Sequence, residues 1–390
     1  MLQERIYLDH NATMPVRPEA ARAVGQALLR GGNPSSVHAE GRRARASLEE
    51  ARSVVAGLVG GAAKNVTFTS GATEALNLAL TPTLHHGTDA RPWHLLVSAT
   101  EHPCVLRGHR FPADAVTVLP VSREGVLDLD ALDAALAADT GSRPLLALQF
   151  ANNETGVIQP LREAAERVHA AGGLLVCDAV QAAGRVPLDI NEIGADMVAL
   201  SAHKLGGPAG IGALVRARDS IHIPDALVRG GGQEKGLRAG TENGPGIAGF
   251  AAAAQAALQS LTEETARITA LRDRLEAGLR SLDGAASVFG AGAARLPNTV
   301  CFALPGMNAQ TALMALDLAG VSVSSGSACS SGTVKASSVL DAMGVQPDMA
   351  KCMLRASLGW TTREADVDGF LAALATTKQR IHTAGRGLAA

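Results

Sequence analysis

The sequence predicts an α/β fold with two lobes, a large lobe built on a mostly parallel seven-stranded sheet and a smaller α+β lobe. Short apolar runs alternate with longer helical patterns over the first two thirds of the chain, which is typical of a parallel sheet with helices on both faces. The pattern changes near residue 247, where a long helical stretch begins. The chain has 390 residues, 47% of them hydrophobic, and is therefore long enough to form two cores.

Seven apolar runs are expected to form the sheet of the large lobe. In chain order they are VTFT (66–69), HLLVS (94–98), AVTVLP (115–120), PLLALQF (144–150), GLLVCDA (173–179), DMVALS (196–201) and GALVR (212–216). The smaller lobe is expected to contain a helix pair over 247–282, the strand NTVCFAL (298–304), a helix near 308–319, the strand-like VSVSS and CMLRASL, and an amphipathic helix over about 363–382. We therefore expect a large domain at 12–250 and a small domain formed by 1–11 and 251–390.

Charge and cysteine content exclude several classes of function. The formal net charge is -2 and no long run of Lys and Arg occurs, so binding to nucleic acid or to a membrane surface has no electrostatic basis. The N-terminus lacks the basic start and apolar run of a signal peptide, and we expect a cytoplasmic protein without a membrane span. Five scattered cysteines without a CxxC pair argue against a disulfide framework or a zinc ribbon.

Polar residues follow the predicted strands, where open α/β sheets bind their ligands. The turn SGATE (70–74) after the first run opens a helix and would bind phosphate through backbone N–H groups, unless it is an ordinary cap. His102, after the second run, is suited to stack on a planar ligand. It is alternatively a satisfied polar histidine, or shares a metal with Cys104, for which the spacing is a weak signal.

The later strands end in acidic and basic residues. Asn153 follows the fourth run within ANNETG. Asp178 directly follows a buried run, where an ionised acid needs a cationic partner such as a protonated ring nitrogen, unless it caps a helix. Lys204 follows the sixth run, and a lysine whose ammonium form is disfavoured by burial is suited to form a Schiff base. The following GGPAGIG lacks the ribose-binding acid of a dinucleotide site, and we expect its glycines to allow chain reversal.

These features fit one cofactor when they are taken together. A phosphate cradle, a ring-stacking histidine, an acid for a ring nitrogen and a Schiff-base lysine are what pyridoxal 5′-phosphate (PLP) requires. No single feature is specific, but the ordered set is.

The same set of motifs resembles the cysteine desulfurases of the NifS/IscS type, within the class V aminotransferases. The resemblance covers nearly the whole chain through YLDHNAT (7–13), GNPSSVH (32–38), FTSGATE (68–74), TEHPC (100–104), NNETGV (152–157), DAVQ (178–181), SAHK (201–204), RAGTEN (238–243), SSGSACSSG (324–332) and RASLG (355–359). It implies the PLP-dependent transferase fold type I and the conversion of L-cysteine to L-alanine.

The resemblance also implies a role for individual residues. Lys204 corresponds to the lysine that carries PLP, Asp178 to the partner of the pyridinium nitrogen, His102 to the ring-stacking residue and Gln181 to the contact of the phenolic oxygen. The implied phosphate ligands are Ala72, Thr73, Ser201, His203 and, from the neighbouring subunit of a homodimer, Thr241. Asn153 and Arg355 correspond to the contacts of the substrate carboxylate, which suits a bidentate guanidinium.

Cys329 is the second focus of the resemblance. It lies in a low-charge Gly/Ser stretch at about 322–338 that we expect to be exposed and mobile, whereas Cys177 and Cys301 lie in apolar runs and are expected to be buried. The motif SSGSAC resembles the long-loop group, in which the cysteine accepts sulfur as a persulfide and passes it to an iron-sulfur scaffold protein. The resemblance implies no resident metal, with Cys329 the one candidate for a transient iron-sulfur ligand.

Two alternatives and some departures from the family pattern remain at this point. Transamination, selenocysteine lysis or β-elimination would share Lys204 and Asp178, but a transaminase has no use for Cys329. A catalytically idle, cofactor-binding scaffold is the other alternative.

His10 and Asn11 replace residues that are small in many relatives, and Trp360 replaces a common basic residue; these changes are expected to affect the entrance to the site.

Overall fold

The computed structural model describes residues 5–326 and 337–387, with side chains of the last helix described as far as residue 381. All seven predicted strands are present in one sheet with the order β2-β9-β8-β7-β6-β4-β5. They are β2 (Val66–Thr69), β4 (Trp93–Ser98), β5 (Val116–Leu119), β6 (Arg143–Gln149), β7 (Leu174–Asp178), β8 (Met197–Ser201) and β9 (Gly212–Arg216). Only β9 runs antiparallel to its neighbours, β2 and β8, so the prediction of a mostly parallel sheet is confirmed.

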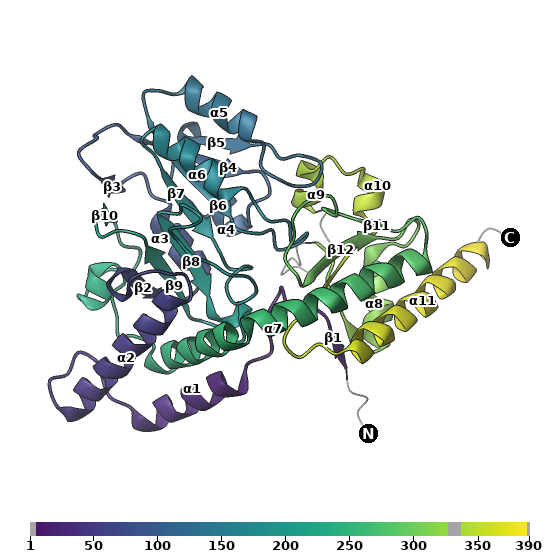
Figure 1. The fold of residues 1–390 in the computed structure, drawn as a ribbon, viewed down its shortest axis with the longest axis horizontal. Coiled ribbons are helices and arrows are strands. Elements are labelled where there is room, and N and C mark those ends of the chain that lie inside the picture. Colours follow the sequence, from purple (N-terminus) through teal and green to yellow (C-terminus); the bar gives the residue numbers. More distant parts are fainter. Residues whose placement is uncertain (1–4, 327–336, 388–390) are drawn as a thin grey trace.

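Helices cover both faces of this sheet (Figure 1). The core on one face includes side chains of α2 (Ala39–Gly57), α5 (Leu129–Ala138), α6 (Leu161–Ala170) and the first part of α7 (Gly244–Leu282), and α1 (Pro18–Arg30) packs against α7. The core on the other face includes α3 (Ala72–Ala79) and the short α4 (Pro103–Leu106). Leu145 and Leu146 of β6 point into opposite cores, as expected for a strand that is buried on both faces.

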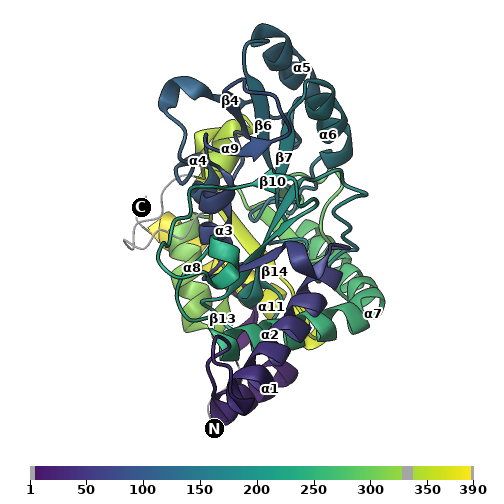
Figure 2. The same ribbon diagram turned by 90° about the vertical axis from the view of Figure 1, so that its left-hand side faces the viewer.

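Figure 2 shows α1 and α2 at one end of the large lobe and α5 and α6 at the opposite end. A separate antiparallel pair, β3 (His85–His86) and β10 (Ile221–His222), lies outside the main sheet.

The small lobe contains an antiparallel sheet with the order β11-β12-β14. Its elements are β11 (Ser287–Val288), β12 (Thr299–Ala303), α8 (Ala309–Leu318), β13 (Val321–Ser322), α9 (Ser338–Ala342), α10 (Pro347–Ala350), β14 (Met353–Ser357) and α11 (Glu364–Gly387). Phe302 of β12 and Phe370 of α11 meet edge to face in its core. The N-terminal strand β1 (Ile6–Tyr7) pairs in parallel with β13, which places it beside these elements.

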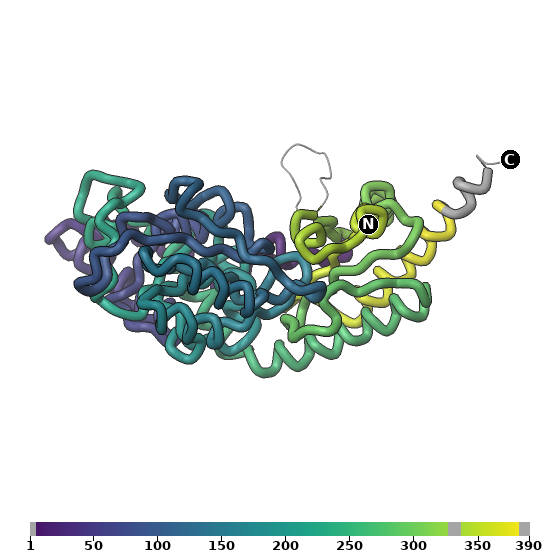
Figure 3. The backbone as a smooth tube through the Cα atoms, turned by 90° about the horizontal axis from the view of Figure 1, so that it is seen from above, coloured from purple at the N-terminus to yellow at the C-terminus, as the bar shows by residue number. Residues whose placement is uncertain are grey.

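The stretch predicted as a helix pair is one continuous helix, α7, of 39 residues, so the predicted break was wrong. Beyond its first turn, α7 contains no proline, and its glycines Gly249 and Gly278 lie where a Cβ would meet neighbouring side chains. These glycines therefore allow close packing and do not end the helix. Phe250 belongs to the large-lobe core and Leu275 to the small-lobe core, so α7 passes along both lobes (Figure 3). The expected domain boundary at residues 250 and 251 falls inside this helix.

Within the described residues, no helix is both long and apolar enough to cross a bilayer.

Candidate functional site

A cavity of about 820 Å³ lies at the carboxyl edge of the parallel strands, with walls from both lobes; we call it the main cavity. Ten of the twelve predicted site residues line it: Ala72, Thr73, His102, Asn153, Asp178, Gln181, Ser201, His203, Lys204 and Arg355. Thr241 is exposed and does not line it. Cys329 lies outside the described residues, but Gly326 and Ser338, on either side of the undescribed segment, line the main cavity.

Lys204 lies directly after β8, at the end of a short 3-10 turn (Ala202–Lys204). Its Nζ atom donates a hydrogen bond to the backbone oxygen of Asn11 at 2.5 Å. Burial, followed by the charges of Arg185 and Arg355, lowers the pKa of Lys204 to about 8, although nearby carboxylates oppose this shift. A lysine with this pKa is partly neutral near physiological pH, and the neutral amine is the form that attacks a carbonyl group.

Asp178 is the last residue of β7 and faces the main cavity. Its Oδ1 atom accepts the backbone N–H of Val180 at 3.0 Å. Burial raises the pKa of Asp178, while this hydrogen bond and electrostatic interactions with the nearby His102 and Lys204 act against the shift. A carboxylate in such a place is stabilised by a cationic group inside the cavity, such as a protonated ring nitrogen.

His102 precedes α4, and its Nδ1 atom accepts the backbone N–H of Cys104 at 3.2 Å. Burial lowers the pKa of His102, which favours the neutral imidazole. Because Nδ1 accepts a hydrogen bond, the proton of the neutral ring lies on Nε2. The thiol of Cys104 is 2.9 Å from Nδ1, and burial raises its pKa, so it is not a thiolate. Among the described residues, no group of three His, Cys, Asp or Glu side chains is placed to hold a metal ion.

The start of α3 offers backbone N–H groups to an anion. Its N-cap residue, Gly71, provides no side-chain acceptor for them, and Ala72 and Thr73 occupy the first turn. A Cβ at Gly212 would lie 2.5 Å from Leu200 O and 2.7 Å from Gly71 Cα, so glycine is required for this turn to lie against β9. Unpaired N–H groups at a helix start bind phosphate.

The turn after β8 contributes polar groups to the same region. Ser201 ends the strand, and His203 lies with its Nδ1 atom 3.2 Å from the hydroxyl of Thr13. Burial and the charge of Lys204 lower the pKa of His203 to about 4, so this side chain is neutral at physiological pH. A neutral imidazole and a hydroxyl are suited to hydrogen bonding with a phosphate group.

Arg355 enters the main cavity from β14 of the small lobe. Its Nη1 atom donates to the backbone oxygen of Asn153 at 2.9 Å, and its Nη2 atom is paired with Asp9. The Nε atom is buried and has no hydrogen-bond partner among the described residues. A buried N–H of a guanidinium is suited to an anionic group of a ligand.

Asn11 connects the predicted residues, a role that the sequence did not reveal. Its backbone oxygen accepts hydrogen bonds from Lys204 Nζ and from Gln181 Nε2, the latter at 3.1 Å. Its side-chain amide donates to Asn153 O at 3.1 Å and to Thr299 Oγ1 at 2.9 Å. Only its place in the motif YLDHNAT, and its departure from small residues in relatives, signalled this position.

Glu101 and Arg185 were also missed. Glu101 lines the main cavity, and its Oε1 atom accepts the backbone N–H of Gln149 at 2.7 Å. Its buried Oε2 atom has no partner in residues 5–326 and 337–387. Burial raises the pKa of Glu101 well above the ordinary value. Glu101 lies within the recognised motif TEHPC and Arg185 lies four residues after DAVQ, which was the only available signal.

Of the three departures from the family pattern, only Asn11 lines the main cavity. His10 is fully buried and its ring bonds to Ser357 O. Trp360 donates from Nε1 to Pro15 O at 3.0 Å and does not line the cavity. The expected effect of His10 and Trp360 on the entrance was therefore wrong. Cys177 and Cys301 are fully buried, as predicted.

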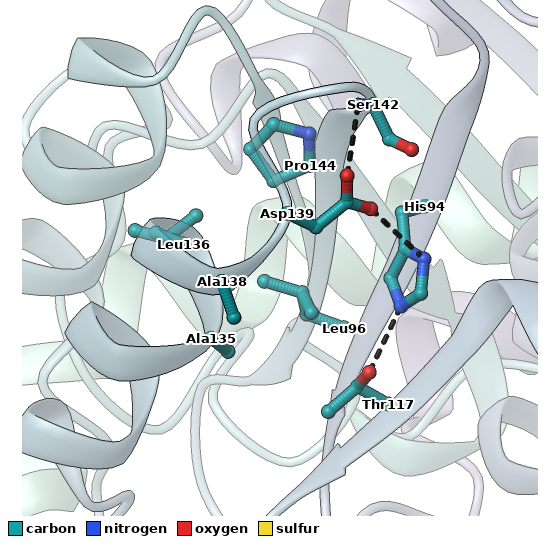
Figure 4. Close-up of a pocket in the computed structure, with 9 residues that line it drawn as sticks. All are labelled: His94, Leu96, Thr117, Ala135, Leu136, Ala138, Asp139, Ser142 and Pro144. Carbon is teal, nitrogen blue, oxygen red and sulfur yellow. Dashed lines mark hydrogen bonds and ion pairs between the residues drawn. The ribbon is translucent and has the colours of Figure 1, made fainter.

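A second cavity, of about 200 Å³, lies at the amino ends of β4, β5 and β6 (Figure 4). His94 Nε2 is 2.9 Å from Thr117 Oγ1, and His94 Nδ1 is 3.4 Å from Asp139 Oδ2. Both ring nitrogens therefore have partners, and the histidine joins the end of α5 to the sheet. Because ligands of open α/β sheets bind at the carboxyl ends of strands, the main cavity is the candidate site.

Comparisons with known proteins agree with this geometry. The sequence profile of the aminotransferase class-V family matches residues 6–370. The chain is 42% identical to a cysteine desulfurase of Cereibacter sphaeroides, over 95% of each chain, and 36% identical to the cysteine desulfurase IscS of Dictyoglomus turgidum, over 98% of this chain and 96% of the relative. The X-ray structure of a NifS-like protein from Rickettsia africae superimposes with a TM-score of 0.87 and 32% identity, covering 96% of this chain and 99% of the other.

Proposed function

The chain belongs to the class-V aminotransferase family and is a cysteine desulfurase, and we propose that it acts through PLP held by Lys204 and through the thiol of Cys329. The observation that carries the proposal is the main cavity, in which Lys204, Asp178 and His102 line one space with the start of α3. L-cysteine is the proposed substrate, and L-alanine the proposed product.

The residues of the main cavity fit PLP. Its volume of about 820 Å³ lies within the range of ligand sites. The N-cap residue of α3, Gly71, provides no side-chain acceptor, and a cationic group would stabilise the charged form of Asp178. Lys204 would hold the cofactor covalently, Asp178 its ring nitrogen, His102 its ring face and Gln181 its phenolic oxygen. The phosphate would be held by Ala72, Thr73, Ser201, His203 and Thr241. When bound, PLP supplies an electron sink that stabilises negative charge at the α carbon of the substrate.

The chain's own groups bind the substrate and move its protons. Arg355 and Asn153 hold the substrate carboxylate, because the guanidinium is already oriented by Asp9 and its Nε–H has no partner within the part of the chain that the structure describes. Lys204 Nζ takes the proton of the α carbon in its neutral form, which its pKa of about 8 makes available. His102 carries its proton on Nε2 and is the proposed donor or acceptor of a second proton.

Sulfur transfer is assigned to Cys329. The thiolate of Cys329 attacks the sulfur of the substrate, so that a new S–S bond forms and the C–S bond breaks. The electron pair of the broken C–S bond stays with the carbon fragment, which gains a proton to become alanine. The enzyme keeps the sulfur as a persulfide. An iron-sulfur scaffold protein is the proposed acceptor, on the strength of the SSGSAC motif.

We further propose a cytoplasmic homodimer. Thr241 is exposed and lies outside the main cavity of its own chain, as expected of a residue that completes the site of a neighbour. The four cysteines within the described residues are all unpaired, which fits a reducing compartment.

The experiment that tests the function measures sulfide and alanine together, with purified protein, PLP, L-cysteine and a reductant. Equimolar products that are lost in both Lys204→Ala and Cys329→Ala are expected, with the cofactor absorbance retained in Cys329→Ala. Pyruvate in place of alanine would support β-elimination, and full turnover by Cys329→Ala would refute the role of that thiol. A bound chromophore without any product would support the scaffold alternative.

A further inference from the structure

Arg185 is buried behind the main cavity, in the turn after β7, without an acidic partner among the described residues. Its Nη1 atom donates to the backbone oxygen and to Oε1 of Gln181, both at 2.6 Å, and its Nη2 atom donates to His10 O at 3.2 Å. Glu264, which lines a small cavity with Arg185, forms an ion pair with Arg17 instead. A buried guanidinium without a counter-ion is costly, which points to a role in the site.

The contacts of Arg185 fix the orientation of the Gln181 amide. A guanidinium only donates hydrogen bonds, so the atom of Gln181 that faces it must be the carbonyl oxygen Oε1. Gln181 Nε2 is thereby turned toward Asn11, to whose oxygen it donates at 3.1 Å. Lys204 donates to the same oxygen, so one hydrogen-bonded network leads from Arg185 to the lysine.

The charge of Arg185 also acts on Lys204. Burial is the largest cause of the lowered pKa of Lys204, and Arg185 is the next, ahead of Arg355. The titratable and charged groups around Lys204 are Asp9, Asp178, His102, His203, Arg185 and Arg355. The two carboxylates favour the protonated lysine, and the charge of Arg185 adds to the effect of burial in opposing them.

We propose that Arg185 is a positioning residue of the site, which holds the Gln181 amide with Nε2 toward Asn11 and places a positive charge behind Lys204. The inference rests on the proposed function, because PLP linked to Lys204 is its reporter.

The test compares four variants of the PLP-loaded protein by the pH midpoint at which the absorbance band of the Lys204-linked cofactor changes. Arg185→Gln and Arg185→Met remove the charge, and Arg185→Lys keeps it. Arg216→Gln is the matched control, because Arg216 is another buried arginine that bonds a backbone oxygen, that of Ile221, and does not line the main cavity. We expect an upward shift of about one pH unit in the first two variants and less than about a third of that shift in the others.

The outcomes distinguish an effect of the Arg185 charge on Lys204 from a general effect of replacing a buried arginine. Equal midpoints in the wild type and in Arg185→Gln or Arg185→Met would overturn the inference, and so would an equal shift in Arg216→Gln. One replacement is polar and the other apolar, so either of them decides the question when the other fails to fold. Protein without any cofactor band would refute the proposed function instead. The pH dependence of Lys204 acetylation, followed by peptide mass spectrometry, would then test the role of Arg185 without the cofactor.

Discussion

Nη2 of Arg355 lies 2.8 Å from Oδ1 of Asp9, and this ion pair joins the N-terminal segment to β14 beside the main cavity. Nη1 of the same guanidinium is held by the backbone oxygen of Asn153. Arg355 is therefore oriented by two partners, and its position depends on segments that are far apart in the sequence.

Arg355→Lys is expected to raise the KM for L-cysteine by about 10- to 100-fold, because an ammonium group cannot reproduce the fixed fork of a guanidinium at a carboxylate. Steady-state kinetics with sulfide detection measure this change, and the cofactor absorbance should remain as in the wild type. Asp9→Asn keeps the guanidinium but removes the charge of its ion-pair partner, so it should raise the KM less than Arg355→Lys does. An unchanged KM in Arg355→Lys would show that the carboxylate binds elsewhere.

The capture of PLP by cofactor-free protein is expected to accelerate with rising pH and to level off above a pH of about 8. Only the neutral amine of Lys204 attacks the aldehyde, and the pKa of Lys204 is lowered from its ordinary value to about 8, chiefly by burial. The growth of the cofactor absorbance at a series of pH values measures this rate. A rate that still rises steeply near pH 10 would show that Lys204 titrates like an exposed lysine.

Glu101→Gln is expected to stabilise the protein relative to the wild type more at pH 8 than at pH 5. The folded-state pKa of Glu101 is raised by burial, so its protonated form contributes stability below the unfolded pKa, and this contribution is lost as the pH rises toward the folded value. Glutamine keeps an acceptor for the Gln149 N–H and carries no charge. Urea unfolding at both pH values gives the two differences in the free energy of unfolding, and equal differences would contradict the prediction.

Thr241→Ala and Lys204→Ala chains are expected to complement each other when they are mixed and allowed to exchange subunits. In a mixed dimer, the Lys204→Ala chain supplies Thr241 to the intact lysine site of the other chain, while the second site is doubly impaired. Random exchange of equal amounts should leave about a quarter of all sites intact. Sulfide production before and after exchange measures the gain, and no gain would place Thr241 in the site of its own chain.

Much of the fold and site was predictable because parallel strands end at one edge of a sheet. Asp178 ends one apolar run and Lys204 follows another, so the sequence predicted that the two residues would lie close together, and both line the main cavity. The roles of Asn11 and Arg185 were not predictable, since they depend on contacts between segments that only the tertiary structure brings together. The continuity of α7 was missed because the Ala-rich stretch 247–258 gives way to the charged TEETARITALRDRLEAGLR, and such a change of composition does not end a helix.

A single helix, α7, contributes side chains to the hydrophobic cores of both lobes, so the two lobes should unfold together. The 39 residues of α7 span roughly 58 Å at 1.5 Å per residue, and they carry core side chains of the large lobe at one end and of the small lobe at the other. A chain cut at residue 250 would expose apolar surface on both fragments, so neither piece should fold alone. The molecule should thus melt as one cooperative unit, and hinge motion between its halves would have to bend a hydrogen-bonded rod.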